Sequence, residues 1–247
     1  MDNIKNIKYS YLVHEAKVLI SALEKRNKDL IKVLAIKENE DILSLSKESF
    51  SLNILSKLDF LQIEPGLHLI FEEFSQTISD VKWDALKKCL DRLGENLLKN
   101  KHPLLLNPSS DSPKPLFGIS ESSFSEIYEF GRDLFTDSRI EDALSIFQVL
   151  LLLTPQCYPF WISHGLCLQS LQDMETALAY YSIAILLEPK HPQAHLLSTE
   201  CHIALGNLSR AKTELVKTEK VLSIHNDYQE WTACYQYIQE LYRAASK

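Results

Sequence analysis

The chain of 247 residues can bury one large core or two small ones, and 45% of its residues are hydrophobic. Its 33 acidic and 26 basic residues give a formal charge of −7, and the basic residues form no stripe of the kind that binds nucleic acid. Six glycines, nine prolines and abundant Leu, Glu, Lys, Ala and Ile favour an all-α protein.

Cysteine usage and hydropathy indicate a cytoplasmic protein. The five cysteines are an odd number without a C-x-x-C pair, which is typical of free thiols in a reducing compartment. His14, Glu15 and Lys17 interrupt the N-terminal apolar residues before a signal-peptide core can form. The longest apolar run, Val149 to Leu153, is too short to cross a bilayer, so we expect no membrane insertion.

The first 100 residues predict a small helical bundle. Leucines spaced by three and four residues predict helices over Tyr9–Lys37 and Asp41–Gln62. Pro65-Gly66 is expected to break the chain before a third helix, Leu67–Ile78, and a fourth helix begins at Asp80. Packing within this bundle is the preferred explanation of the apolar stripes, and a homodimer contact through these helices is the alternative.

A linker follows at residues 101–119, where four prolines and three serines interrupt every helical period. Beyond it, residues 120–247 contain three segments of the 34-residue length that characterises tetratricopeptide repeats. These repeats are residues 124–157, 158–191 and 192–225. The sequence therefore predicts an N-terminal bundle (1–100), a linker and a superhelix of three helical hairpins.

The middle repeat matches the tetratricopeptide pattern best, with His164 in place of the usual leucine before glycine. Its pattern residues are Trp161, Gly165, Leu168, Ala177, Tyr181, Ala184 and Pro189. The first repeat has Ile127, Phe130, Gly131, Leu134, Ala143, Phe147 and Pro155 at the same places. The third keeps small residues but lacks the aromatic residue and the closing proline, as its residues are His195, Ser198, Thr199, His202, Ala211, Leu215 and Thr218. A degraded last repeat fits an array that is closed by a capping helix, predicted at residues 227–245.

Small residues are expected where the two helices of each hairpin cross, namely Gly131, Gly165, Ala143, Ala177 and Ala211. The turns suit the same register. Ser138-x-x-Glu141 is a possible capping box, and Asp173 and Asn207 are expected to cap the later second helices. Pro159 and Pro192 suit the first turns of new helices.

The first helices of stacked hairpins line a concave face, so their outward residues are the candidate ligand contacts. This predicted groove consists of Tyr128, Arg132, Phe135, Ile162, Leu166, Gln169, Leu196, Glu200 and Ile203. The lining is mostly apolar and lacks a Lys and Asn array that would hold a C-terminal carboxylate. An extended apolar peptide therefore fits this groove better than an acidic tail.

Residues 120–225 resemble the tetratricopeptide class II chaperones of bacterial type III secretion. The likeness is carried by Phe160-Trp161, Gly165, Cys167, Gln169, Ala179-Tyr180-Tyr181, Pro192, His195, Glu200-Cys201 and Leu205-Gly206. The resemblance implies a bacterial cytoplasmic chaperone that holds a secreted, hydrophobic translocator-type client in its groove before export. Tyr128, Phe135, Ile162 and Leu166 would then supply pockets for the client.

No nucleotide-binding, zinc-protease or hydrolase motif occurs in the sequence, so no catalytic residue, cofactor or metal site is assigned. His191, His195, Cys201 and His202 lack the spacing of a metal site, and Cys167 and Cys201 are expected in the core. Two alternatives remain. The repeats could be a scaffold or adaptor in a secretion or other multiprotein assembly, or they could recruit substrate to an enzyme site in the N-terminal bundle.

Overall fold

The computed structural model describes residues 63–88, 121–154, 157–224 and 226–246. The chain divides into two compact units, Met1–Pro155 (unit 1) and Gln156–Lys247 (unit 2). The two predicted helices before residue 63, any homodimer contact through them, the linker at 101–119 and Cys89 lie outside the described residues. The predicted division into a bundle, a linker and a repeat domain therefore stays a prediction.

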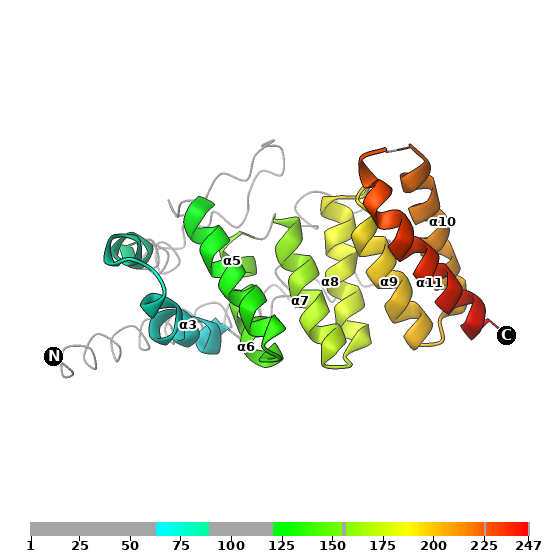
Figure 1. Ribbon diagram of the computed structural model, residues 1–247. Coiled ribbons are helices and arrows are strands. Elements are labelled where there is room, and N and C mark those ends of the chain that lie inside the picture. Colours follow the sequence, from blue (N-terminus) through cyan, green and yellow to red (C-terminus); the bar gives the residue numbers. More distant parts are fainter. Residues whose placement is uncertain (1–62, 89–120, 155–156, 225, 247) are drawn as a thin grey trace, which may run out of the picture. The chain divides into compact units, whose positions relative to one another are not determined.

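All regular structure within the described ranges is helical, which confirms the all-α prediction. Unit 1 contains α3 (Ile63–Glu72), the 3-10 helix η3 (Phe74–Gln76), a helical segment at 80–88, α5 (Glu121–Thr136) and α6 (Ile140–Leu153). Unit 2 contains α7 (Tyr158–Ser170), α8 (Met174–Leu187), α9 (Pro192–Ala204), α10 (Leu208–Ile224), the 3-10 helix η5 (Asn226–Trp231) and α11 (Thr232–Ala245) (Figure 1). None of the described helices is both long and apolar enough to cross a bilayer.

The backbone repeats with the predicted period of 34 residues. Ser138, Gln172 and Gly206 have positive φ angles of 62°, 66° and 71°, and each lies 34 residues from the next. The following residue donates its N–H to a carbonyl five residues back in all three turns, for example Asp173 to Leu168 at 2.9 Å. This pattern is the Schellman ending of a helix, and its recurrence confirms the three hairpins.

The helix starts agree only in part with the predicted caps. Asp173 caps α8 by accepting a hydrogen bond from the Thr176 N–H at 3.1 Å, and Pro159 and Pro192 lie in first turns as predicted. The capping box at Ser138 was wrong, because the left-handed backbone of Ser138 belongs to the preceding turn. Arg139 is instead the N-cap of α6, and it makes no side-chain cap bond.

The predicted small residues do lie at the helix crossings. A Cβ atom on Gly165 would lie 2.4 Å from Tyr181 Cε1, and one on Gly131 would lie 2.8 Å from Phe147 Cε1. Ala143, Ala177 and Ala211 are fully buried. Each aromatic ring therefore fills the space that the glycine of its hairpin leaves open.

In unit 1, α3 packs against α6, the second helix of the first repeat. The predicted break at Pro65-Gly66 was wrong, because both residues lie inside α3. Pro65 is the third residue of the helix, where its missing N–H costs no intrahelical bond. Gly66 permits close contact, since a Cβ there would lie 2.3 Å from the Ser145 carbonyl oxygen.

Further contacts join the segment after α3 to the first repeat. The Phe74 and Phe130 ring centroids are 5.4 Å apart. Both terminal nitrogens of Arg139 donate to Glu73, at 2.7 and 2.9 Å. The next helix begins at Asp80, as predicted. Residues 63–76 are thus packed against the first hairpin.

The predicted C-terminal cap is present, although its first part is the 3-10 helix η5 and α11 begins only at Thr232. Helix α11 packs on α9 and α10. Ile238 is buried together with Leu196 and Leu215. This cap covers apolar surface that a further repeat would otherwise cover.

Candidate functional site

The nine predicted groove residues differ in exposure. Ile162 and Leu196 are buried, with exposed fractions of 3% and 4%. Arg132 is exposed, and the remaining six are half-buried, namely Tyr128, Phe135, Leu166, Gln169, Glu200 and Ile203. The contribution of all nine to peptide binding stays a prediction, but the half-buried residues can reach a ligand without a change in the fold.

In unit 2, the structure joins two predicted groove residues from neighbouring hairpins. Gln169 Nε2 on α7 donates a hydrogen bond to Glu200 Oε2 on α9 at 2.8 Å. The Tyr181 hydroxyl on α8 donates to Gln169 Oε1, also at 2.8 Å. The ring of Tyr181 is fully buried against Gly165, and burial raises the pKa of its hydroxyl, which therefore remains a donor at neutral pH. We call the half-buried surface of Leu166, Gln169 and Glu200 the α7–α9 surface.

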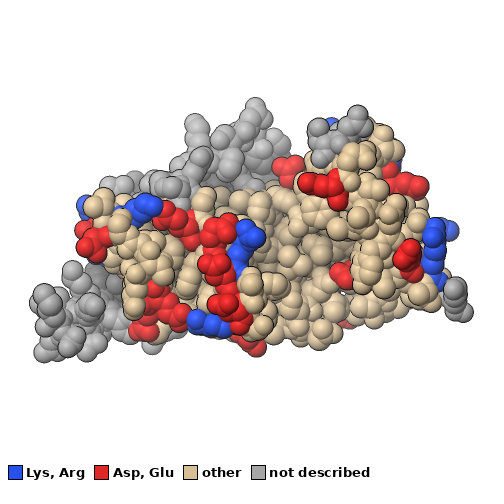
Figure 2. Space-filling view, viewed as in Figure 1, with Lys and Arg blue, Asp and Glu red and all other residues tan. Residues whose placement is uncertain are grey.

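The α7–α9 surface lies in a part of unit 2 that has almost no charge. Helices α7, α8 and α9 contain no lysine or arginine, and their only acidic residues are Glu175 and Glu200. The space-filling view is mostly free of charged side chains over these helices (Figure 2). The sequence alone shows this scarcity of charge. The hydrogen bonds that connect Tyr181, Gln169 and Glu200 are visible only in the folded structure.

The other two groove residues of the third repeat face the C-terminal cap. Leu196 is part of the buried cluster with Leu215 and Ile238. Ile203 packs against the same cluster, as do Trp231, Tyr235, Leu241 and Tyr242. A peptide could contact Leu196 only if α11 moved, whereas the residues of the α7–α9 surface lie outside this cluster.

Three groove residues belong to unit 1. The Tyr128 ring lies 5.8 Å from that of Phe147, and Phe135 is half-buried. Arg132 forms an ion pair with Glu129 at 3.2 Å within α5. Aromatic area is therefore available on α5 beside a charge that is already neutralised.

His164 is a buried polar residue, and in the sequence it stands out only because it departs from the repeat pattern. Its ring stacks on Tyr180 with centroids 4.1 Å apart, and its exposed fraction is 1%. Neither ring nitrogen has a hydrogen-bond partner within the described residues. Burial lowers the pKa of His164 to about 3, so the imidazole is neutral in the fold.

The cysteines of the repeats behave as packing residues. Cys167 and Cys201 are fully buried, which confirms their predicted place in the core. Burial raises the pKa of each thiol to about 12, and the carboxylate of Glu200 adds to the effect at Cys201. Both remain protonated at neutral pH, so neither has the thiolate that nucleophilic or redox chemistry needs.

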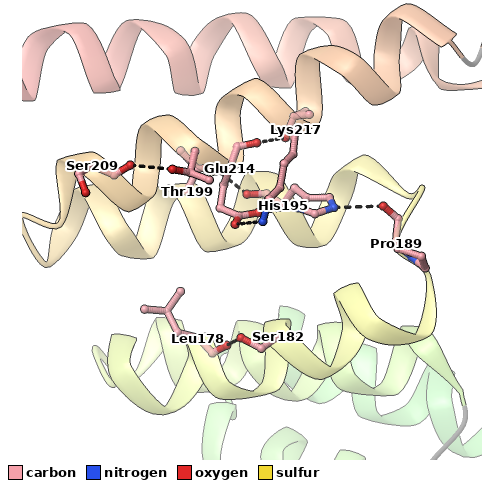
Figure 3. A network of polar contacts seen from close by, with 10 residues as sticks. Leu178, Ser182, Pro189, His195, Thr199, Ser209, Glu214 and Lys217 are labelled. Carbon is pink, nitrogen blue, oxygen red and sulfur yellow. Dashed lines mark hydrogen bonds and ion pairs between the residues drawn. The ribbon is translucent and has the colours of Figure 1, made fainter. Parts of the chain in front are cut away.

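Two of the histidines that the sequence offers as possible metal ligands, His191 and His195, contact other groups. His195 Nδ1 lies 2.6 Å from Glu214 Oε2 and its Nε2 lies 3.2 Å from the Pro189 carbonyl oxygen (Figure 3). Burial pushes the pKa of Glu214 up, but hydrogen bonds from His195 and Lys217 outweigh it and the pKa is lowered. This network links α9 to α10 and to the turn before α9.

His191 also has a structural role. Its Nδ1 accepts the N–H of Gln193 at 3.3 Å, which caps α9, and lies 3.1 Å from the Tyr158 hydroxyl. Its ring centroid is 5.6 Å from that of Trp231. His191 thus connects the start of α7 to the C-terminal cap.

Comparison with known proteins supports the resemblance seen in the sequence. No protein-family model matches the chain. The low calcium response locus protein H of Yersinia pestis is 23% identical over 112 residues, which cover 45% of this chain and 67% of that protein. The repeats are similar to those of type III secretion translocator chaperones.

Two solved structures illustrate the likeness. PcrH, in complex with the chaperone binding region of PopD, is 26% identical with a TM-score of 0.48, covering 53% of this chain and 98% of PcrH. The Yersinia enterocolitica type III secretion translocator chaperone SycD is 21% identical with a TM-score of 0.48, covering 51% of this chain and 92% of SycD.

Proposed function

We propose that this protein is a bacterial cytoplasmic chaperone that holds an apolar segment of a secreted, translocator-type client before type III export. The observation that carries the proposal is the α7–α9 surface, a half-buried face of a tetratricopeptide array. The carboxylate of Glu200 is the single charged group on this surface. The sequence likeness to protein H of Yersinia pestis supports it. No catalytic residue enters this function.

The physical basis is the burial of apolar area. A segment that will insert into a membrane exposes apolar surface and aggregates in water. Covering that surface contributes about 25 cal/mol per Å² of apolar area removed from water. Leu166 offers such area in unit 2, and Tyr128 and Phe135 offer it separately in unit 1. The fixed hairpins lose little conformational freedom when a segment binds.

Co-expression with secreted proteins of the same bacterium tests the proposal. We expect the full-length chain to capture an apolar secreted protein in fixed stoichiometry. Leu166→Lys should weaken capture by about tenfold or more, because a buried lysine replaces an apolar contact worth at least ~1.4 kcal/mol. Leu166 suits the test better than Ile162, because Ile162 is buried in the core.

Ser182→Lys is the matched control, since Ser182 is exposed on α8 and lies outside the α7–α9 surface. It should leave capture unchanged. The solubility of the client decides between chaperone and scaffold. A client that aggregates alone and stays dissolved with this chain supports the chaperone, whereas a client that is soluble alone favours an adaptor. Absence of any captured secreted protein would refute the chaperone.

A further inference from the structure

We propose that Glu200 determines specificity on the α7–α9 surface, and that the client segment bound there carries a lysine or arginine between apolar residues. This inference rests on the proposed function, because it names the chemistry of the segment that the same surface holds. Three observations support it: the fixed position of the carboxylate, its unused oxygen, and the absence of a compensating cation on α7, α8 and α9.

The carboxylate is held in place from the hairpin core. The Tyr181 hydroxyl fixes Gln169 Oε1, which leaves Gln169 Nε2 directed at Glu200 Oε2. The ring of Tyr181 is fully buried, so this chain of hydrogen bonds starts from an immobile group. A positioned acceptor loses little side-chain freedom when a ligand binds to it.

None of the residues that the structure describes donates to the second carboxylate oxygen of Glu200. Within the described part of the chain, Glu200 Oε1 accepts no hydrogen bond, and Glu200 forms no ion pair. The side chain is half-buried, so water solvates it only in part. A donor from a bound segment could reach Oε1 without displacing Gln169 from Oε2.

Charge complementarity identifies the class of donor. A half-buried carboxylate loses solvation, and a nearby cation offsets that loss. Helices α7, α8 and α9 supply no lysine or arginine, so the charge is not compensated by its own neighbours on these helices. A client lysine or arginine would supply the cation, and its long aliphatic stem would pack beside Leu166. An acidic residue at the same place would be repelled.

The experiment uses the full-length protein and three synthetic peptides of alternating leucine and proline with one central residue, which is lysine, norleucine or glutamate. Fluorescence anisotropy measures the Kd of each. We expect the lysine peptide to bind wild type about three- to tenfold more tightly than the norleucine peptide, and the glutamate peptide to bind most weakly. Added salt should weaken the binding of the lysine peptide only.

Glu200→Gln keeps the shape of the side chain and should abolish the preference for lysine, while binding of the norleucine peptide stays unchanged. Tyr181→Phe should reduce the preference without removing the carboxylate. Glu175→Gln removes the same charge from an exposed position of α8 and should have no effect. These variants separate the role of Glu200 from net charge.

Equal binding of all three peptides to wild type would overturn the inference and leave the proposed function standing. Failure of every peptide to bind would overturn both. A synthetic peptide of residues 1–37 that displaces the lysine peptide would assign the surface to a segment of this chain and overturn the client assignment.

Discussion

The ring of Tyr181 occupies the space that a side chain on Gly165 would need, since a Cβ there would lie 2.4 Å from Cε1 of the ring. The same ring carries the hydroxyl that positions Gln169 at 2.8 Å. The close packing of α7 on α8 at Gly165 and the arrangement of the α7–α9 surface therefore both involve this pair of residues.

Gly165→Ala should lower the free energy of unfolding by about 1–3 kcal/mol, because the added methyl displaces a ring in a filled core. It should also weaken the preference for a basic peptide, since the hydroxyl moves with the ring. Urea unfolding and peptide anisotropy measure the two effects. Ser182→Ala, at an exposed position of α8, should change stability by less than about 0.5 kcal/mol. An unchanged stability of the Gly165 variant would show that the ring moves aside freely.

His164→Leu should raise the free energy of unfolding by about 1–2 kcal/mol at neutral pH, because it removes a buried imidazole without a hydrogen-bond partner. The pH dependence should change too. The folded pKa of about 3 lies below the unfolded value of 6.5, so protons bind preferentially to the unfolded chain.

Wild type should accordingly keep the full contribution of neutral His164 above about pH 6.5. It should lose about 1.4 kcal/mol for each pH unit below that value, until the folded pKa is reached. Urea midpoints at pH 7.5 and about 5.5 should differ less in His164→Leu than in wild type. Identical pH slopes for both proteins would contradict a buried neutral imidazole.

At the left-handed turns, introducing a glycine and removing one should have opposite effects on stability. Gln172→Gly should stabilise the protein by about 0.5–1 kcal/mol, because glycine adopts a φ of 66° without the steric penalty of a side chain. Gly206→Ala should destabilise by about 1 kcal/mol, although no atom lies within 4 Å of the added Cβ. Thermal melting measures both changes. If both variants had the same melting temperature as wild type, these turns would not be rigid in solution.

The contact between His195 and Glu214 predicts a contrast between a single and a double substitution. Glu214→Ala should cost about 1–3 kcal/mol, because it leaves Nδ1 of an almost fully buried imidazole without its hydrogen-bond partner. Replacing both residues, with His195→Phe and Glu214→Leu, should restore most of that loss, since two apolar side chains need no partner. Urea unfolding of the three proteins tests this. A double variant as unstable as the single one would mean that the shape of the two side chains, and not their hydrogen bond, decides the packing.

The sequence predicted the repeats well because their period recurs in residues that packing requires. Gly131, Gly165 and the buried alanines mark helix crossings, and such sites accept few other side chains. The left-handed turn at Ser138 was missed because serine, unlike glycine, does not indicate a positive φ angle. Only alignment with Gly206, two periods later, could have revealed that Ser138 ends one helix and does not cap the next.

The remaining differences arise from tertiary contacts. Pro65-Gly66 looks like a chain break in the sequence, yet the glycine is required by the approach of α3 to Ser145. In the candidate site, the spacing of Gln169 and Glu200 placed both on outward faces. Their bond could not be predicted, because it depends on how far apart α7 and α9 lie.

The packing of α3 on α6 determines where this protein can be shortened. The proline-rich stretch at 101–119 invites truncation just before the first repeat. Such a fragment would lack α3 and would therefore expose part of α6. Val149 and Leu150 belong to α6 and are almost fully buried in the whole chain. Fragments that begin after residue 100 should therefore precipitate or self-associate, whatever the quality of their repeats.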